Sequence, residues 1–180
     1  MKRWIGSLVL ALTLAAGVAA AQPPQHPDGA LGFHEVDAPI GIRWWFSGQK
    51  LALDLGLGFG SDEVANENLS HFAFEAGLPI VLKSWDRVHF MVRPGIVYRS
   101  QEVIIDPGPP VITDNDHFFT VQGELEAEVF LVENVSVSAS QGFAIVNSDF
   151  AGGGSSTDFG TTGANFTRIG FHVYLFGNAR

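Results

Sequence analysis

The chain contains, at residues 51–59, the stretch Leu-Ala-Leu-Asp-Leu-Gly-Leu-Gly-Phe, in which every odd position is large and apolar and every even one is alanine, aspartate or glycine. Successive side chains of a β-strand point to opposite faces, so the stretch predicts a strand with one apolar face and one small, polar face. Its length matches the roughly nine to eleven residues of a tilted strand that crosses a bilayer. The apolar face therefore lies against either a protein core or lipid, and the rest of the chain must distinguish the two.

The same alternation recurs along the chain and predicts further strands. With residues 50–60, the predicted strands are 39–47, 69–83, 87–101, 117–132, 134–147 and 164–176. Single-chain bacterial barrels have an even number of strands, and residues 30–36 are the remaining segment that can supply an eighth. The sequence therefore predicts an all-β fold, an antiparallel up-and-down β-barrel of about eight strands.

Short and long connections alternate strictly between the predicted strands. The short ones are 47–49, 83–86 and 133–134, and the long ones are 61–68, 100–116 and 147–163. The long connections contain Asp-Pro-Gly-Pro-Pro at 106–110 and Gly-Gly-Gly-Ser-Ser at 152–156, which favour turns and cannot continue a strand. Outer-membrane barrels have short periplasmic turns and long outer loops, so the alternation is typical of a transmembrane barrel. Within the predicted strands, Pro79 and Pro94 each remove a ladder donor, and a bulge or kink is expected at both.

The N-terminus has the three parts of a secretory signal peptide. Two basic residues at 2–3 precede an uncharged apolar run over 4–18, and three alanines at 19–21 follow. We predict cleavage after Ala21, because the apolar run is shorter than the ~20 residues of a membrane-spanning helix. The alternative is an uncleaved anchor helix. The predicted organisation is a signal peptide at 1–21, a disordered segment at 22–29 and a barrel domain at 30–180.

The composition excludes several classes of function. The chain of 180 residues carries 10 basic and 19 acidic side chains, and cleavage after Ala21 would leave eight basic ones and a formal charge of −11. No basic patch is left that could neutralise a nucleic-acid backbone, so a nucleic-acid partner is not expected. The chain has no cysteine, so neither a disulfide framework nor a lipid anchor at the cleavage site is expected.

Three features favour lipid over a protein core for the apolar faces. The predicted strands are longer than the roughly five or six residues usual in soluble proteins, and their opposite faces are rich in glycine, alanine and serine, which suits a crowded interior. Aromatic residues also gather near strand ends, as in the girdles of membrane barrels. These aromatic residues are Trp44, Trp45, Phe46, Trp85, Tyr98, Phe118, Phe119, Tyr174 and Phe176. The residues predicted to face lipid are Leu51, Leu53, Leu55, Leu57, Phe59, Ile169, Phe171, Val173 and Leu175. The alternative is a soluble lipocalin-like barrel that binds a small apolar ligand.

The polar faces of the strands predict a charged interior of nearly balanced sign. Its members would be Arg43, Asp54, Glu75, Arg93, Arg99, Glu124, Glu126, Glu128 and Arg168. Buried charges are costly unless paired, and arginine can hold a carboxylate through two parallel hydrogen bonds, so an ion network in the lumen is expected. About eight strands leave room for side chains only, so the network predicts a structural plug. A narrow solute pore is the less favoured alternative.

Four segments of the predicted barrel combine strand patterns with turn residues. They are Gly-Ile-Arg-Trp-Trp-Phe-Ser at 41–47, the stretch 51–60, Val-Arg-Pro-Gly-Ile-Val-Tyr at 92–98 and Gly-Phe-His-Val-Tyr-Leu-Phe at 170–176. In these segments the chain resembles the small outer-membrane β-barrel superfamily, which includes the OmpA-like and OmpX-like barrels. The resemblance implies an eight-stranded barrel in a Gram-negative-type outer membrane, with a role between envelope integrity and adhesion. It identifies no activity.

The sequence has no pattern that indicates catalysis or metal binding. Ser70 and His71 are adjacent on a predicted strand and point to opposite faces, which argues against a nucleophile–base pair. The histidines His34, His71, His89 and His172 lack the close spacing of metal ligands. Acidic side chains of the outer connections could attract divalent cations that bridge lipopolysaccharide, although solvation is their usual role. They are Asp62, Glu63, Glu67, Glu102, Asp106, Asp114 and Asp116.

The sequence therefore predicts an integral protein of the cell outer membrane with a plugged polar interior, exported by its signal peptide. Its role would be structural or in surface interactions, without catalysis, cofactor or metal. The expected partners are outer-membrane lipids, lipopolysaccharide and the barrel-insertion machinery. The expected state is a monomer.

Overall fold

The structure, a computed structural model, describes residues 25–33, 38–46, 48–108, 110–161 and 167–177, so the predicted signal peptide at 1–21 lies outside the described residues. All the regular secondary structure in the described part of the chain is β-strand. The strands are β1 (Gly29–Phe33), β2 (Ile40–Trp45), β3 (Ala52–Val64), β4 (Glu67–Gly77), β5 (Ile80–Trp85), β6 (Val88–Asp106), β7 (Ile112–Val132), β8 (Val135–Asp149), β9 (Ser155–Gly160) and β10 (Thr167–Phe176).

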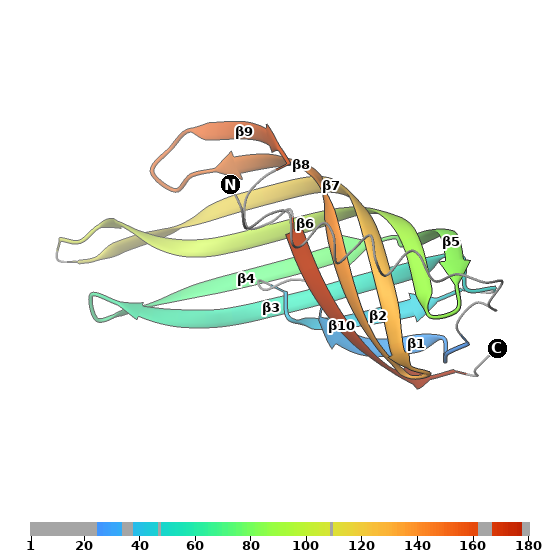
Figure 1. Cartoon of the computed structure of the whole chain (residues 1–180). Helices are drawn as coiled ribbons and strands as arrows, with labels where there is room; N and C mark the ends of the chain where they lie inside the picture. The colour runs from blue at the N-terminus through green and yellow to red at the C-terminus, as the bar shows by residue number, and fades with distance from the viewer. Residues whose placement is uncertain (1–24, 34–37, 47, 109, 162–166, 178–180) are drawn as a thin grey trace, which may run out of the picture.

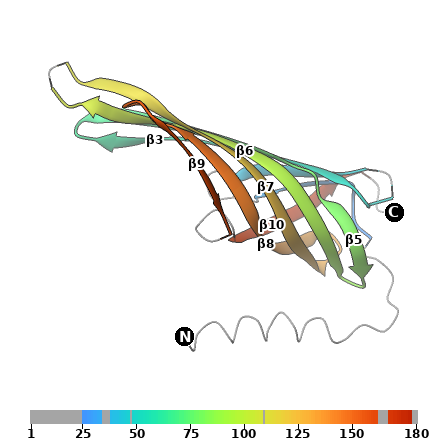
Figure 2. The ribbon, with the colours of Figure 1, turned by 90° about the horizontal axis from the view of Figure 1, so that it is seen from above.

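Eight of these strands close into an antiparallel barrel (Figures 1 and 2). Their order around the barrel is β10, β1, β2, β3, β4, β6, β7 and β8, and β8 pairs with β10 to complete the ring. The predicted all-β barrel of about eight strands is confirmed. β1 pairs with both β10 and β2, which confirms the predicted first strand over residues 30–33, while 34–36 lie outside the described residues. The two further strands, β5 and β9, pair with β6 and β8.

The segment predicted as one strand at 69–83 forms two strands that follow the same side of β6. β4 pairs with the part of β6 around Gly95, and β5 pairs with the part that begins at Val88. Leu78 and Pro79 separate them, because proline has no amide hydrogen to donate to a ladder. The prediction at Pro79 was a bulge or kink within one strand, and the structure instead divides that strand in two.

Pro94 lies directly opposite this interruption. Its carbonyl oxygen accepts a hydrogen bond from the Leu78 amide at 2.9 Å, and a strand residue directs its nitrogen and its carbonyl to the same side. The Pro94 nitrogen, which carries no hydrogen, therefore faces the break between β4 and β5. No continuous strand lies there that would accept a hydrogen bond from it. On its other side, Pro94 pairs with Gly123 in unbroken register, so the bulge predicted at Pro94 does not occur in the β6–β7 ladder.

The connections predicted as long loops are mostly paired strands. The β3–β4 hairpin continues to Val64 and Glu67, and β6 and β7 remain paired almost to their turn, so both hairpins project beyond the other strands at one end of the barrel (Figure 1). The loop prediction was wrong because ladder hydrogen bonds join main-chain groups and do not require an apolar alternation. Tight turns suffice to reverse the chain, with positive φ at Ala65 and Asn66 in the first hairpin. We call this end the hairpin end and the opposite one, where the short connections lie, the turn end.

The barrel carries apolar side chains outside and charged ones inside. Leu57, Phe59 and Ile169 are 45%, 75% and 70% exposed on the outer face, whereas the inward-facing Arg43 and Asp54 are fully buried. The predicted lipid-facing residues lie on the outer face, in alternation with inward-pointing residues that are mostly buried: Leu51, Leu53, Leu55, Leu57, Phe59, Ile169, Phe171, Val173 and Leu175. This polarity is the reverse of that of a soluble barrel.

Candidate functional site: the barrel interior

The centre of the interior is an ion network, and Arg43 on β2 is one of its two hubs. Its guanidinium donates two parallel hydrogen bonds to Asp54, from Nε to Oδ1 at 2.8 Å and from Nη2 to Oδ2 at 2.9 Å. It also donates to Glu126 and Glu128 on β7, at 2.9 Å each. Arg43 and Asp54 are register partners on β2 and β3, so strand pairing itself brings the two charges together.

Arg93 on β6 is the second hub. Its Nε donates to Asp54 Oδ2 at 2.7 Å and its Nη1 to Glu124 Oε2 at 2.9 Å, and Nη2 contacts Glu75. Arg168 on β10 is the third arginine of the network. Its Nη1 contacts the same Glu75 oxygen as Arg93 does, and its Nε lies 3.2 Å from Glu124. Asp54 and Glu75 thus each join two arginines.

The network has five carboxylates and three arginines, and further polar side chains of the interior contact it. Glu128 accepts hydrogen bonds from the Ser136 hydroxyl at 2.5 Å and the Tyr174 hydroxyl at 2.8 Å, and His172 Nδ1 lies 3.3 Å from it. Gln122 accepts a hydrogen bond from Arg168 at 2.8 Å. The nine residues predicted for the lumen did not include these partners, although their inward parity on β7, β8 and β10 was a usable signal.

The structure brings together eight of the nine charged residues predicted for the lumen. The ninth, Arg99, lies six residues beyond Arg93 on β6, about 20 Å farther toward the hairpin end at roughly 3.4 Å per residue. There its guanidinium lies over the ring of Phe118, 5.7 Å from the ring centroid. Arg99 therefore belongs to a different part of the lumen from the eight residues of the network.

Very little space is left within the ion network. A cavity of about 10 Å³ lies there, lined by Arg93, Glu126, Arg168 and small residues of β8 and β10. A cavity of that size holds about one water molecule at most. The side chains therefore fill the cross-section of the barrel at this level.

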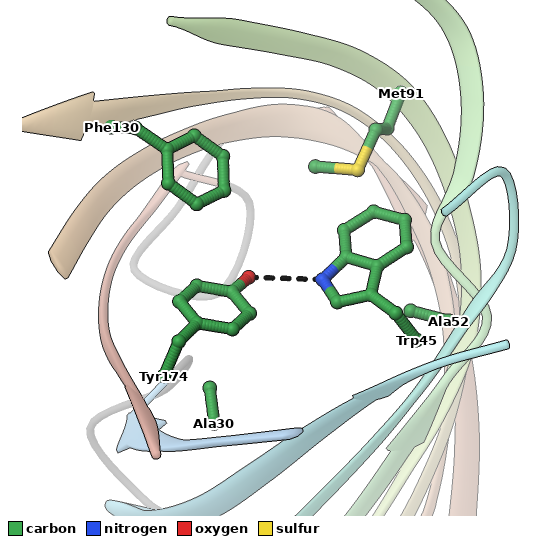
Figure 3. Packing of buried hydrophobic residues seen from close by; sticks show 6 residues of the cluster. All are labelled: Ala30, Trp45, Ala52, Met91, Phe130 and Tyr174. Atoms are coloured by element: carbon green, nitrogen blue, oxygen red, sulfur yellow. Dashed lines mark hydrogen bonds between the residues drawn. The ribbon is translucent and has the colours of Figure 1, made fainter. Parts of the chain in front are cut away.

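An aromatic cluster closes the turn end of the interior (Figure 3). Its members are Ala30, Trp45, Ala52, Met91, Phe130 and Tyr174. The Trp45 indole donates a hydrogen bond to the Tyr174 hydroxyl at 3.0 Å, and Tyr174 donates to Glu128, which links the cluster to the ion network. The sequence assigned Trp45 and Tyr174 to an outer girdle, but both are only 1% exposed, inside the barrel. Strand parity explains the correction, because the adjacent Trp44 is the outward residue, 45% exposed.

The chain before β1 also packs into this end. His26 is fully buried, its imidazole stacked on Phe130 at 4.7 Å between ring centroids and close to Tyr174 at 4.4 Å. Gln49 in the β2–β3 connection donates a hydrogen bond to the His26 carbonyl at 2.8 Å. Residues 22–29 were predicted to be disordered; of these, the structure describes 25–29 and packs them across the turn end.

The hairpin end, in contrast, contains a cavity of about 230 Å³. Its lining comes from β4, β6 and β7: His71, Phe72, Ala73, Arg99, Ser100, Gln101 and Phe118. At its edge His71 Nδ1 lies 3.7 Å from Asp62. Outside the cavity, hydrogen bonds from Thr113 and Ser70 hold the pKa of Glu102, in the projecting hairpin, below its ordinary value.

The described residues offer neither a catalytic triad nor a metal centre. Ser70 hydrogen-bonds Glu102 rather than the adjacent His71, and His89 Nδ1 shares a hydrogen bond with Ser84 at 2.8 Å. No group of three or more potential metal ligands occurs among the described residues, and His34 lies outside them. The described part of the chain also contains no helix that could span a bilayer.

Comparison with known proteins finds no family model, no curated protein and no solved structure that matches this chain.

Proposed function

We propose that this protein is an integral β-barrel of the outer membrane, with a plugged polar interior and a structural or surface-interaction role without catalysis. One observation carries the proposal, namely the reversed polarity of the barrel. Every strand of the closed ring has an outward apolar residue that is at least 40% exposed. Examples, one per strand, are Leu31, Ile42, Leu57, Phe72, Ile96, Leu125, Phe143 and Leu175.

A surface of this kind is unfavourable in water. The largest apolar patch on a soluble monomer is roughly 300–600 Å², whereas apolar residues here surround the whole barrel. Burying apolar surface contributes roughly 25 cal/mol per Å², so a hydrocarbon environment stabilises this outer face strongly. A lipocalin-like barrel would instead need an apolar interior for its ligand, and the interior here is occupied by charges.

The interior supports a plug rather than a pore. Direct hydrogen bonds join the carboxylates and guanidiniums of the ion network, the cavity left among them is about 10 Å³, and the aromatic cluster with His26 closes the turn end. An ion that crossed the barrel would have to break several buried charge pairs, which costs several kcal/mol. We therefore propose that the barrel does not conduct.

The proposed location and partners follow from this assignment. Residues 1–21 would direct export, the barrel-insertion machinery would place the chain in the outer membrane, and lipids with lipopolysaccharide would surround it as a monomer. The short connections at the turn end would then face the periplasm and the projecting hairpins the exterior.

Fractionation with a gel-shift assay tests the proposal. The full chain, expressed in a Gram-negative host, is expected in the outer-membrane fraction after a carbonate wash. Its unheated form should migrate differently from its boiled form in a denaturing gel, as folded barrels do. Recovery of the mature protein in the soluble periplasmic fraction would overturn the membrane assignment. Stepwise currents in planar bilayers would overturn the plug and favour a pore.

A further inference from the structure

We propose that Lys83, on the outer wall at the turn end, binds the phosphate of an anionic phospholipid. Its ammonium is held over the Trp85 ring, and the acyl chains of the lipid would lie on the apolar wall beside it. The inference names a lipid headgroup and the residues that bind it. It rests on the proposed function, because a headgroup reaches the outer wall only in a membrane.

A register shift in β5 turns Lys83 to the outer face. Val81 packs inward against the aromatic cluster, so strict alternation would direct Lys83 inward as well. The β5–β6 ladder shifts between these two residues, and Lys83 then pairs with the outward Phe90. The next residue, Ser84, points inward and shares a hydrogen bond with His89. Of the basic residues in the described strands, Lys83 alone lies on the outer face.

Lys83 lies near the turn-end edge of an uncharged outer band. The outward residues of β6 in this band are Val88, Phe90, Val92, Pro94, Ile96 and Tyr98. Ten residues at about 3.4 Å each span about 34 Å along the strand, or about 26 Å along the axis of a barrel with strands tilted by about 40°. This height matches the apolar band of roughly 25 Å in outer-membrane barrels. Because Lys83 pairs with Phe90, it lies one outward position inside the edge of the band.

The ammonium of Lys83 points out of the band, toward the turn end. Its Nζ lies 5.2 Å from the centroid of the Trp85 ring, and tryptophan is the aromatic side chain that attracts a cation best. Trp85 pairs with Val88, two residues closer to the turn end than Phe90. The lysine stem therefore covers apolar wall while its charge reaches the level of the headgroups, where tryptophan is enriched in membrane proteins.

The apolar part of a lipid also finds a surface at this position. Leu82 and Ile80, both on β5, are 56% and 40% exposed. Together with Phe90 they provide apolar wall directly beside the Lys83 ammonium. A charged group at the edge of an apolar wall fits a molecule that has a phosphate at one end and hydrocarbon at the other.

The distribution of charge favours an anionic lipid at the turn end. Lys50, Lys83 and Arg87 all lie at this end, opposite the projecting hairpins (Figure 1). The acidic residues of the turn end are Asp28, Asp86 and Glu133, and those of the hairpins are Asp62, Glu63, Glu67, Glu102, Asp106, Asp114 and Asp116. The hairpins therefore repel an anionic headgroup, whereas the turn end does not. A zwitterionic headgroup carries its own cation, which competes with Lys83 for the phosphate.

The test measures the preference of the folded barrel for phosphatidylglycerol. Dihexanoyl phosphatidylglycerol and dihexanoyl phosphatidylcholine are titrated separately into the isotope-labelled mature protein in dodecylmaltoside micelles, and amide chemical shifts are followed. Saturable shifts at Lys83, Ser84 and Trp85 are expected, at a phosphatidylglycerol fraction at least fivefold lower than that of phosphatidylcholine. The two lipids have the same acyl chains, so their partition into the micelle is matched. Inorganic phosphate, titrated alone, separates a lipid site from a site for a free anion.

Three variants and one control locate the site. Lys83→Gln should reduce the preference to less than twofold, and Lys83→Arg should retain it because the charge remains. Trp85→Leu preserves apolar surface without the ring and should lower the preference only in part. Lys50→Gln removes the same charge from the β2–β3 connection and should bind as the parent does. The folded-barrel gel shift verifies that each variant folds.

Equal affinity of the folded parent for the two lipids would overturn the inference, as would an unchanged preference in Lys83→Gln. Equal shifts with inorganic phosphate alone would overturn the lipid assignment in favour of a free anion. These outcomes concern a barrel already folded in micelles, so they leave the proposed membrane function intact. Recovery of the protein as a soluble periplasmic barrel would instead refute that function and this inference together.

Discussion

The two ends of the lumen are built differently, although the same strands form both. At the turn end, Trp45, Phe130 and Tyr174 pack against the buried His26. At the hairpin end, Arg99 and Phe118 line an open cavity of about 230 Å³. Because the described residues are closely packed at one end and leave a cavity at the other, we expect stability to be concentrated at the turn end.

The difference arises from what the inward positions carry. Near the turn end they are large aromatic or charged residues, and their side chains fill the cross-section of the barrel. Toward the hairpin end, Gly58, Gly60 and Ala73 occupy inward positions of β3 and β4, and small side chains cannot fill a barrel cross-section. The ion network lies between the ends and separates them.

The largest effect on stability is expected from a substitution in the ion network, which lies between the two ends of the lumen. Arg43→Leu removes one hub: Glu128 loses its arginine, and Asp54 and Glu126 keep Arg93 but lose Arg43, which should destabilise the barrel by about 3–5 kcal/mol. Urea unfolding in lipid vesicles measures this change. Arg87→Gln, on the exposed turn between β5 and β6, serves as the matched control and should change the unfolding free energy by less than about 0.5 kcal/mol. Equal stability of Arg43→Leu and the parent would contradict the network as a stabilising plug.

A pair of truncations compares the two ends directly. Phe130→Ala creates a cavity in the aromatic cluster and should cost about 3–5 kcal/mol. Phe118→Ala enlarges a cavity that is already open and should cost about 1 kcal/mol or less. The same urea series reports both values. If Phe118→Ala were the more harmful of the two, the hairpin end would be the packed one and the comparison would be wrong.

The outer face provides a second comparison, between the barrel wall and the β3–β4 hairpin that projects beyond it. Leu55→Arg should impair insertion and cost about 2–4 kcal/mol if the residue lies at the bilayer midplane. Val64→Arg, nine residues farther on β3 and about 30 Å along the strand, should cost less than about 0.5 kcal/mol because it lies in the projecting hairpin. The folded fraction in the gel-shift assay reports insertion. Equal folded fractions for the two variants would indicate that lipid does not surround Leu55.

The smallest effect concerns pH at the turn end. Burial lowers the pKa of His26 below 6.5 in the packed chain, although Glu128 and Asp28 oppose this shift. His26 therefore binds a proton more readily in the released segment than in the packed one. The packed state is fully stable above about pH 6.5, and its stability decreases as the pH falls through the lowered pKa of His26. One proton changes the stability by at most about 1.4 kcal/mol per pH unit.

Limited proteolysis of residues 22–28 between pH 8 and pH 5 measures release of this segment. Cleavage should increase on acidification, and the increase should disappear in His26→Phe, which retains the stacking on Phe130 without a titrating group. An unchanged pH dependence in His26→Phe would show that another group, such as the neighbouring His89, controls the release.

Strand positions and facing were largely predictable from particular residues. The alternation around Asp54 assigned it to the interior, and its partner Arg43 was placed there by the same parity. Pro79 predicted a local irregularity in a strand, and the structure has a full break there. The loops were mispredicted because residues 100–116 have turn residues at their centre, and local composition does not reveal that the flanking residues pair with each other.

The sequence by itself determined the barrel class and which side chains share a face of each strand, because a period of two directly encodes that sharing. Tertiary structure alone decided which charges meet, that Trp45 and Tyr174 close one end, and that Arg99 stands apart beside a cavity. Those properties depend on the register between strands and on the height of each residue along the barrel. Closure of the barrel brings together side chains as distant in the chain as Arg43 and Glu128, and no local pattern of the sequence records that contact.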